Sequence, residues 1–124
     1  MSKPDSAFDN SWRILGICPE EKHQKQLMDL VRSEISNAST TELAEYPDQR
    51  QLGQILQAQQ PNVCFVDTTP NLEKALVLIS LLIKADPGIG IVAILGSNHP
   101  ETILRCLRPG AAEFMIAPLT SAQL

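Results

Sequence analysis

The chain has 124 residues, of which 44% are hydrophobic, so we expect a single domain with a packed interior. Aromatic residues make up only 4% of the sequence, which predicts a core built from Leu, Ile, Val and Ala. The formal net charge of -4 and the sequence pI of about 5.0 argue against the clustered Lys and Arg of a nucleic-acid-binding domain. We therefore expect no nucleic acid to bind through this domain.

The sequence carries no pattern that indicates a membrane segment or a signal peptide. Its most apolar stretch, residues 75–83, is much shorter than the ~20 residues that span a bilayer. Residues 1–11 are polar and lack the apolar centre of a signal peptide, so we expect a disordered leader before one domain over residues 12–124. A further helix would begin after Pro118, which predicts a truncated final helix and a domain that is the front part of a longer protein.

Cys18, Cys64 and Cys106 form no CxxC pair and have no metal-ligand spacing. Reduced, buried thiols are therefore expected, in a cytoplasmic protein. Cys18 lies closest to the expected functional end of the domain, so it is the thiol to test for reactivity.

Four short apolar runs predict strands, over residues 13–18, 62–67, 90–95 and 113–116. Nearly continuous apolar runs of this length are typical of strands that are buried on both faces of a parallel sheet. A weaker strand is expected within residues 38–44, where serine and threonine favour extended structure.

Helical patterns separate these strands. We expect one helix to open at Pro19 and another to begin at an Asp48 cap and run to about Gln59. A third helix, over residues 71–85, is apolar on more than one face, so it is either deeply buried or forms an interaction surface. A fourth helix begins at residues 99–101 and ends before Pro109.

The alternation of strands and helices predicts an α/β fold, a doubly wound five-stranded parallel sheet with the flavodoxin-like strand order 2-1-3-4-5. In this topology the carboxyl ends of the first and third strands are neighbours. The sequence therefore places Cys18 and Pro19 beside Asp67, a carboxylate at the end of a buried strand. His23 lies on the polar face of the first expected helix, and His99 lies near the start of the fourth. Neither histidine belongs to a nucleophile–histidine–acid arrangement, so both are expected to be solvated.

Two segments resemble the receiver domains of response regulators. Residues 108–118, RPGAAEFMIAP, resemble the receiver ending R-x-G-A-x-[DE]-[FY]-[LM]-x-K-P, and residues 61–67, PNVCFVD, resemble the phosphoacceptor strand. The resemblance covers residues 13–120 and implies a CheY-like fold with a cis bond before Pro118. The intact pattern of strands and helices agrees with this fold.

The functional positions of the receiver family are carried over one at a time. The phosphoacceptor aspartate matches Asp67, whereas the metal-binding acid pair falls at Cys18 and Pro19. The hydroxyl residue after the fourth strand falls at Gly96, one residue before a serine, and the conserved lysine of the family is replaced by Ala117. The resemblance therefore implies a degenerate receiver, or pseudo-receiver, that keeps the acceptor and lacks its partners.

These replacements predict that phosphotransfer is lost, so we expect no enzymatic activity, no catalytic residue and no cofactor. Phosphoryl transfer depends on positioning and charge neutralisation, and Mg²⁺ prefers carboxylate and water ligands. The alternative is a two-component response regulator that accepts a phosphoryl group on Asp67, with Mg²⁺ held by Glu20 or Glu21. A third reading is a small-ligand binder that uses the cleft near Gly16, Cys18, Asp67 and Gly96.

The degenerate positions also resemble those of the N-terminal domains of TadZ/CpaE-type pilus-assembly localisation ATPases. That resemblance implies a signalling or localisation module in pilus assembly that acts by protein–protein interaction, with a protein partner or as a homodimer. The usual output surface of receiver domains corresponds here to residues 100–108 and 113–118, with Arg105, Arg108 and Glu113 as its polar candidates. No direct membrane insertion is expected.

Overall fold

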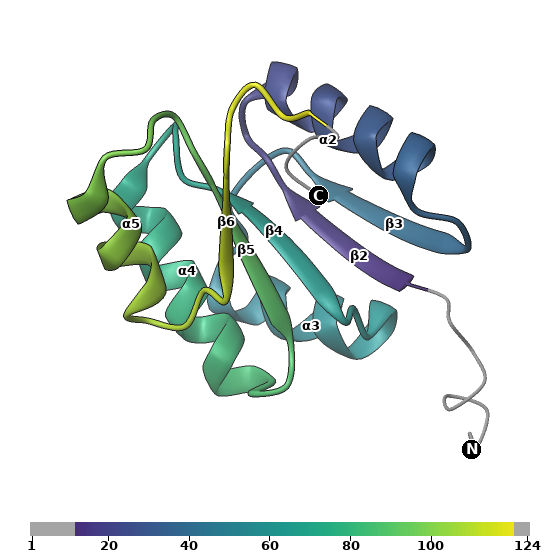
Figure 1. Cartoon of the computed structure of the whole chain (residues 1–124). Helices are drawn as coiled ribbons and strands as arrows, with labels where there is room; N and C mark the ends of the chain where they lie inside the picture. The colour runs from purple at the N-terminus through teal and green to yellow at the C-terminus, as the bar shows by residue number, and fades with distance from the viewer. Residues whose placement is uncertain (1–11, 121–124) are drawn as a thin grey trace.

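The structure is a computed structural model that describes residues 12–120 (Figure 1). The expected leader over residues 1–11 and the end of the chain after residue 120 lie outside the described residues. One sheet of five parallel strands has the spatial order β3-β2-β4-β5-β6, which is 2-1-3-4-5 in chain order, as predicted. The strands are β2 (Trp12–Ile17), β3 (Ala38–Leu43), β4 (Val63–Asp67), β5 (Gly90–Leu95) and β6 (Glu113–Ile116).

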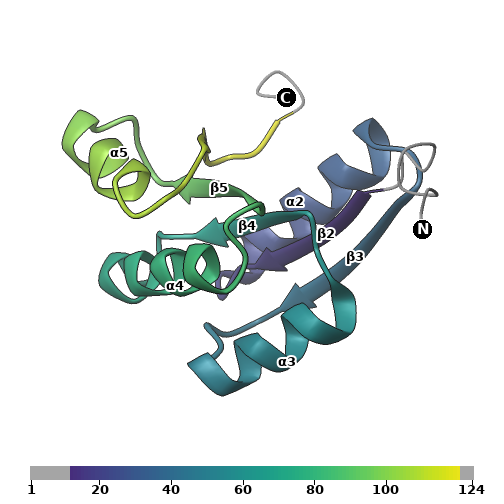
Figure 2. The ribbon, with the colours of Figure 1, turned by 90° about the horizontal axis from the view of Figure 1, so that it is seen from below.

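Four helices connect the strands, namely α2 (Glu21–Glu34), α3 (Gln49–Gln59), α4 (Leu72–Ala85) and α5 (Pro100–Leu107). Helix α2 covers one face of the sheet, and the other three helices lie on the opposite face (Figure 2). The predicted Asp48 cap is confirmed, since its carboxylate accepts a hydrogen bond of 2.8 Å from the backbone N–H of Gln51. The expected strand over residues 13–18 lies one residue earlier in the structure.

Aliphatic side chains fill a core layer on each face of the sheet. Leu15, Val66 and Ile91 belong to the layer under α3, α4 and α5. Phe65 and Ile94 belong to the layer under α2, together with Leu27 of that helix. Because β4 and β5 are covered on both faces, their sequences are almost continuously apolar, as expected for a parallel sheet.

Two contacts fix the N-terminal half of α2 against the sheet. Gly16 allows a close approach, because a Cβ atom there would lie 3.0 Å from Leu27 Cδ2. The side-chain amide of Gln24 donates to the backbone carbonyls of Gly16 and Leu43, at 3.3 and 3.2 Å. The first turn of α2 is thereby held beside the carboxyl ends of β2 and β3.

Helix α4 is the apolar helix of the sequence, and the structure shows one buried stripe together with an exposed apolar residue. Ala75, Leu78, Ile79 and Leu82 are buried against the sheet, while the side chain of Val77 is 60% exposed. No helix among residues 12–120 is long and apolar enough to cross a membrane.

Candidate functional site

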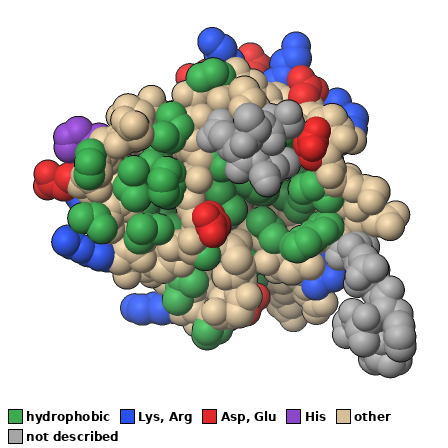
Figure 3. Space-filling view, in the orientation of Figure 1, with side chains coloured by type: hydrophobic (Ala, Val, Ile, Leu, Met, Phe, Trp, Pro, Cys, Tyr) green, Lys and Arg blue, Asp and Glu red, His purple; other side chains and the backbone are tan. Residues whose placement is uncertain are grey.

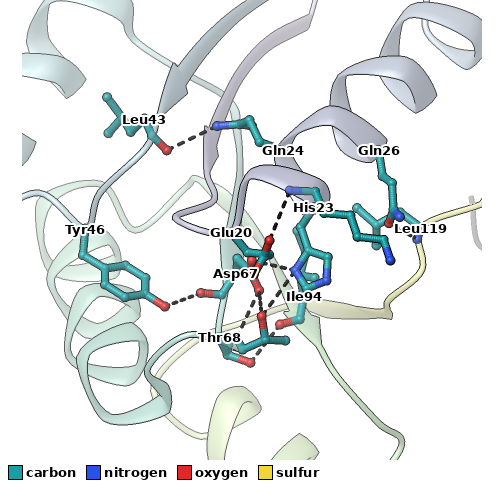
Figure 4. A network of polar contacts seen from close by, with 12 residues as sticks. Glu20, His23, Gln24, Gln26, Leu43, Tyr46, Asp67, Thr68, Ile94 and Leu119 are labelled. Carbon is teal, nitrogen blue, oxygen red and sulfur yellow. Dashed lines mark hydrogen bonds and ion pairs between the residues drawn. The ribbon is translucent and has the colours of Figure 1, made fainter.

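Asp67 ends β4 on the face covered by α2, and its side chain is fully buried, with 0% exposure. Both carboxylate oxygens have partners (Figure 4). Oδ2 lies 2.8 Å from His23 Nδ1. Oδ1 accepts hydrogen bonds from the backbone N–H of Thr69 at 3.0 Å and from the hydroxyl of Thr69 at 2.8 Å. The carboxylate is therefore enclosed by protein donors.

The elements around Asp67 explain this arrangement. Thr69 stands two residues after the aspartate, where an Asp side chain commonly accepts from the backbone in an Asx turn. The turn is fixed to β5 by Thr68, whose N–H and hydroxyl both donate to the carbonyl of Ile94, at 2.9 and 2.8 Å. His23 lies in the first turn of α2, which the Gln24 contacts hold over the same end of the sheet.

The hydrogen-bond network indicates which nitrogen of His23 carries the proton. The single hydroxyl proton of Thr69 is donated to Asp67 Oδ1. A carboxylate oxygen is an acceptor, so the proton between Oδ2 and Nδ1 belongs to the imidazole. The Nδ1 atom also lies 3.3 Å from the Thr69 hydroxyl oxygen. His23 therefore donates into the buried site, and 15% of its side chain remains exposed.

Tyr46 closes the site from the loop between β3 and α3. Its hydroxyl donates a hydrogen bond of 2.6 Å to the backbone carbonyl of Asp67. Burial, and then the negative charge of Asp67, raises the pKa of Tyr46 to about 12. The phenol consequently stays protonated and acts as a donor at neutral pH.

The positions that the receiver resemblance singles out surround this carboxylate. Cys18 is buried directly after β2, and Pro19 follows it. Gly96 lies next to Thr69, since a Cβ atom there would be 3.5 Å from Thr69 Cγ2. Ala117 packs against the core layer under α2, and its peptide bond to the following proline is cis, as expected. The negative charge of Asp67 acts on the Cys18 thiol, which agrees with the predicted neighbourhood of these two residues.

Comparison with solved structures identifies the architecture. A response regulator from Thermotoga maritima matches with a TM-score of 0.75 and 12% identity, over 90% of this chain and 88% of that one. The signal receiver domain of a DNA-binding response regulator (merR) from Colwellia psychrerythraea matches with a TM-score of 0.74 and 18% identity, over 90% of both chains. The chain has the receiver-domain fold.

A putative pilus assembly protein (cpaE) from Burkholderia thailandensis also shares this receiver fold. It matches with a TM-score of 0.70 and 18% identity, over 89% of this chain and 88% of that one. No protein-family model matches the sequence, and a comparison with curated proteins gives no match either. At these identities the similarity establishes the fold alone.

The residues of this receiver fold do not fit a Mg²⁺ site. Mg²⁺ requires several oxygen ligands in near-octahedral geometry. Both oxygens of Asp67 are already hydrogen-bonded, Cys18 offers a buried thiol and Pro19 has no side-chain donor atom. Among residues 12–120 no group of three or more His, Cys, Asp and Glu is placed to hold a metal ion.

Glu20 and Glu21, the acids expected to substitute as ligands, lie at the start of α2. Glu20 is the N-cap of the helix, and its carboxylate accepts a hydrogen bond of 3.3 Å from the backbone N–H of Lys22. Glu21 is exposed in the first helical turn, where a negative charge favours the helix dipole. These contacts give both acids a structural role in the helix.

The expectation that His23 is solvated was wrong. It rested on the polar character of that face of α2, but the helix N-terminus packs over Asp67. The strand order could have indicated the contact, because it places the loop after β2 next to the loop after β4. Thr69 and Tyr46 were also missed as site residues. The Asp-x-Thr spacing was a usable signal for Thr69, while no local pattern marks Tyr46.

The residues of the predicted interaction surface differ in their contacts and in their exposure. Arg105 of α5 forms an ion pair of 2.6 Å with Glu73 of α4, whereas Arg108 and Glu113 are exposed. Hydrophobic side chains reach the surface on this side of the molecule (Figure 3), where Leu104 is 49% and Phe114 39% exposed.

Cys18 is expected to be inert, although its position suggested a test of reactivity. Burial, and then the charge of Asp67, raises the pKa of its thiol from 9.0 to about 12, so the nucleophilic thiolate is scarce at pH 8. Burial likewise raises the pKa of the Cys64 and Cys106 thiols. We expect iodoacetamide at pH 8 to add no mass to the native protein and to modify all three cysteines in denaturant. Rapid single modification of Cys18 in the native protein would show that this loop opens.

Proposed function

We propose that this chain is a receiver-fold signalling or localisation module that acts through protein contacts and does not accept a phosphoryl group. The observation that carries the proposal is the state of Asp67. Its carboxylate has 0% exposure, and both oxygens are hydrogen-bonded to His23 and Thr69. An acceptor that is enclosed in this way has no free oxygen to present to phosphorus.

The surroundings of Asp67 also lack the charges that phosphoryl transfer requires. Transfer to a carboxylate brings negative charges together, so catalysis depends on cations that meet the oxygens of the phosphoryl group. The position expected for a lysine is Ala117, and the positions expected for metal-binding acids are Cys18 and Pro19. The imidazole of His23 instead faces the carboxylate itself. These replacements support a scaffold that is retained for its contact surfaces.

Intact mass spectrometry after incubation with acetyl phosphate and Mg²⁺ tests this proposal. We expect the wild type and Asp67→Asn to give the same unmodified mass, because the carboxylate is enclosed and no Mg²⁺ site lies beside it. A response regulator with an intact acid pair and lysine serves as the positive control for the reagent. A single phosphoryl adduct on the wild type that is absent from Asp67→Asn would refute the proposal.

The second candidate is a phosphoaccepting response regulator that uses Asp67 and Mg²⁺. The observation in its favour is that the acceptor carboxylate itself is kept at the end of β4. It requires the His23 contact to open and Glu20 or Glu21 to leave the helix terminus. In that case the adduct would also disappear on chelation of Mg²⁺ and decrease in Glu20→Ala or Glu21→Ala.

A role in pilus assembly is the most specific form of the proposal. It is supported by the sequence resemblance to TadZ/CpaE-type domains and by the fold shared with the putative pilus assembly protein. The partner would be another protein or a second copy, and the α5–β6 side with Leu104, Arg108 and Phe114 is the candidate surface. The coding sequence that follows residue 124 tests this: an ATPase domain with a deviant Walker motif supports pilus localisation, and a helix-turn-helix supports transcriptional control.

A further inference from the structure

A cleft of about 690 Å³ lies between α4 and the loop that joins β3 to α3. An ion pair joins Glu73 at the edge of this groove to Arg105 of α5. The lining of the groove is defined by Pro19, Glu45, Tyr46, Pro47, Asp48, Glu73, Lys74, Val77, Leu78 and Leu81.

The floor of the groove is apolar. Val77 is the most exposed large hydrophobic side chain of the described residues, at 60%, and it stands beside the half-buried Leu81. Leu78 lies beneath them in the core, while Pro47 and the Tyr46 ring form the facing wall. These residues account for the unusual apolar character of α4, because one stripe of the helix packs on the sheet and another faces this groove. An exposed apolar groove of this kind marks a binding surface.

The rim of the groove is acidic. Glu45, Asp48 and Glu73 border it, against the single cation Lys74. Glu73 forms an ion pair with Arg105, and one oxygen of Asp48 caps α3, whereas Glu45 is exposed at the rim. The whole chain also carries a formal net charge of -4. The field at the groove therefore favours a positively charged ligand.

We propose that this groove docks a basic amphipathic helix of a partner protein. Apolar side chains of the helix would cover Val77 and Leu81, and its Lys or Arg residues would face the acidic rim. A second copy of this chain is a poorer occupant, because a two-fold contact would bring the two acidic rims together. The inference rests on the proposed function, since it names a surface and a partner class for an interaction module.

The groove is also connected to the buried carboxylate. Tyr46 lines the groove with its ring and donates its hydroxyl to the Asp67 carbonyl at 2.6 Å. A helix that packs against this ring consequently contacts the loop that closes over Asp67. We therefore expect a ligand in the groove to shift the backbone amide signals of Asp67 and Thr69 as well as those of α4.

The test is a titration of the ¹⁵N-labelled chain with a synthetic amphipathic helix of Leu and Lys, followed by backbone amide shifts. A peptide with the same Leu positions and Glu in place of Lys is the matched probe. We expect saturable shifts at Tyr46, Val77 and Leu81 with the Lys peptide, and none with the Glu peptide. Equal binding of the two peptides, or shifts confined to the α5–β6 side, would refute the proposal.

Two variants that each add one negative charge show where the peptide binds. Val77→Asp removes an apolar side chain from the floor of the groove. We expect it to lower the affinity for the Lys peptide by about tenfold, as for the loss of one buried aliphatic contact. Ala58→Asp adds the same charge at an exposed position of α3 outside the groove, and we expect it to leave the affinity unchanged. Equal weakening by both variants would contradict the assignment, as would a native dimer that Val77→Asp dissociates. The acetyl phosphate result does not depend on the groove, so the two proposals fail separately.

Discussion

Replacing His23 by alanine is expected to lower the free energy of unfolding by about 2–3 kcal/mol, measured by urea denaturation at pH 7. A hydrogen bond to a charged group contributes about 1.5–3 kcal/mol, and a buried acceptor that loses its donor keeps its desolvation cost. We take the upper part of that range because the Asp67 carboxylate is fully buried, although Thr69 still donates to it. The expected loss is a large fraction of the stability of a small domain.

His99 provides the matched control. It is an exposed histidine at the N-terminus of α5 and makes no side-chain cap hydrogen bond. His99→Ala is therefore expected to change stability by less than about 0.5 kcal/mol. In the Asp67→Asn background, His23→Ala should cost at least about 1 kcal/mol less than in the wild type, because the buried charge is gone. Equal effects of the two histidines would show that the His23–Asp67 contact does not form.

Replacing Gly110 by alanine is expected to cost about 2–4 kcal/mol in the free energy of unfolding. The residue has a φ of 139°, a backbone conformation that L residues with side chains rarely adopt. A Cβ atom there would also overlap the side chain of Ile83 on α4. The loop between α5 and β6 would have to move, and β6 with it.

Gly53 is the control for this substitution. It lies inside α3, and a Cβ atom at that position would meet no heavy atom within 4 Å. Gly53→Ala is expected to stabilise the protein by about 0.5–1 kcal/mol, since alanine has the higher helix propensity. Thermal unfolding followed by circular dichroism distinguishes the two variants. A Gly110→Ala protein as stable as the wild type would contradict the described packing of this loop on α4.

The fold was accessible from the sequence because its signals are local and periodic. The apolar runs over residues 63–67 and 90–95 are almost unbroken, which predicts strands covered on both faces. Asp48 marks a helix start by capping chemistry, and it caps α3 in the structure. Alternation of strands and helices then restricts the topology to a few arrangements. Even the weak strand over residues 38–44 was expected within a residue of its bounds.

The site was only partly accessible, because its contacts join residues that are distant in sequence. Asp67 and the loops around it follow from the strand order. The contact between His23 and Asp67 depends on how deeply the first turn of α2 settles on the sheet, which Gly16 and Gln24 determine. No sequence pattern reports that depth. The amphipathic pattern of the helix predicted a solvated His23, whereas in the structure the side chain packs over Asp67.

The central claim is that the Asp67 carboxylate is held by His23 within the protein. The most direct test is a long-range ¹H–¹⁵N correlation spectrum of the histidine side chains, recorded before and after addition of excess Mg²⁺. We predict a protected Nδ1 proton on His23 and no change of the His23, Asp67 and Thr69 signals with Mg²⁺. A freely exchanging His23 ring, together with a saturable Mg²⁺-dependent shift of Asp67, would contradict this claim and favour a working phosphoacceptor.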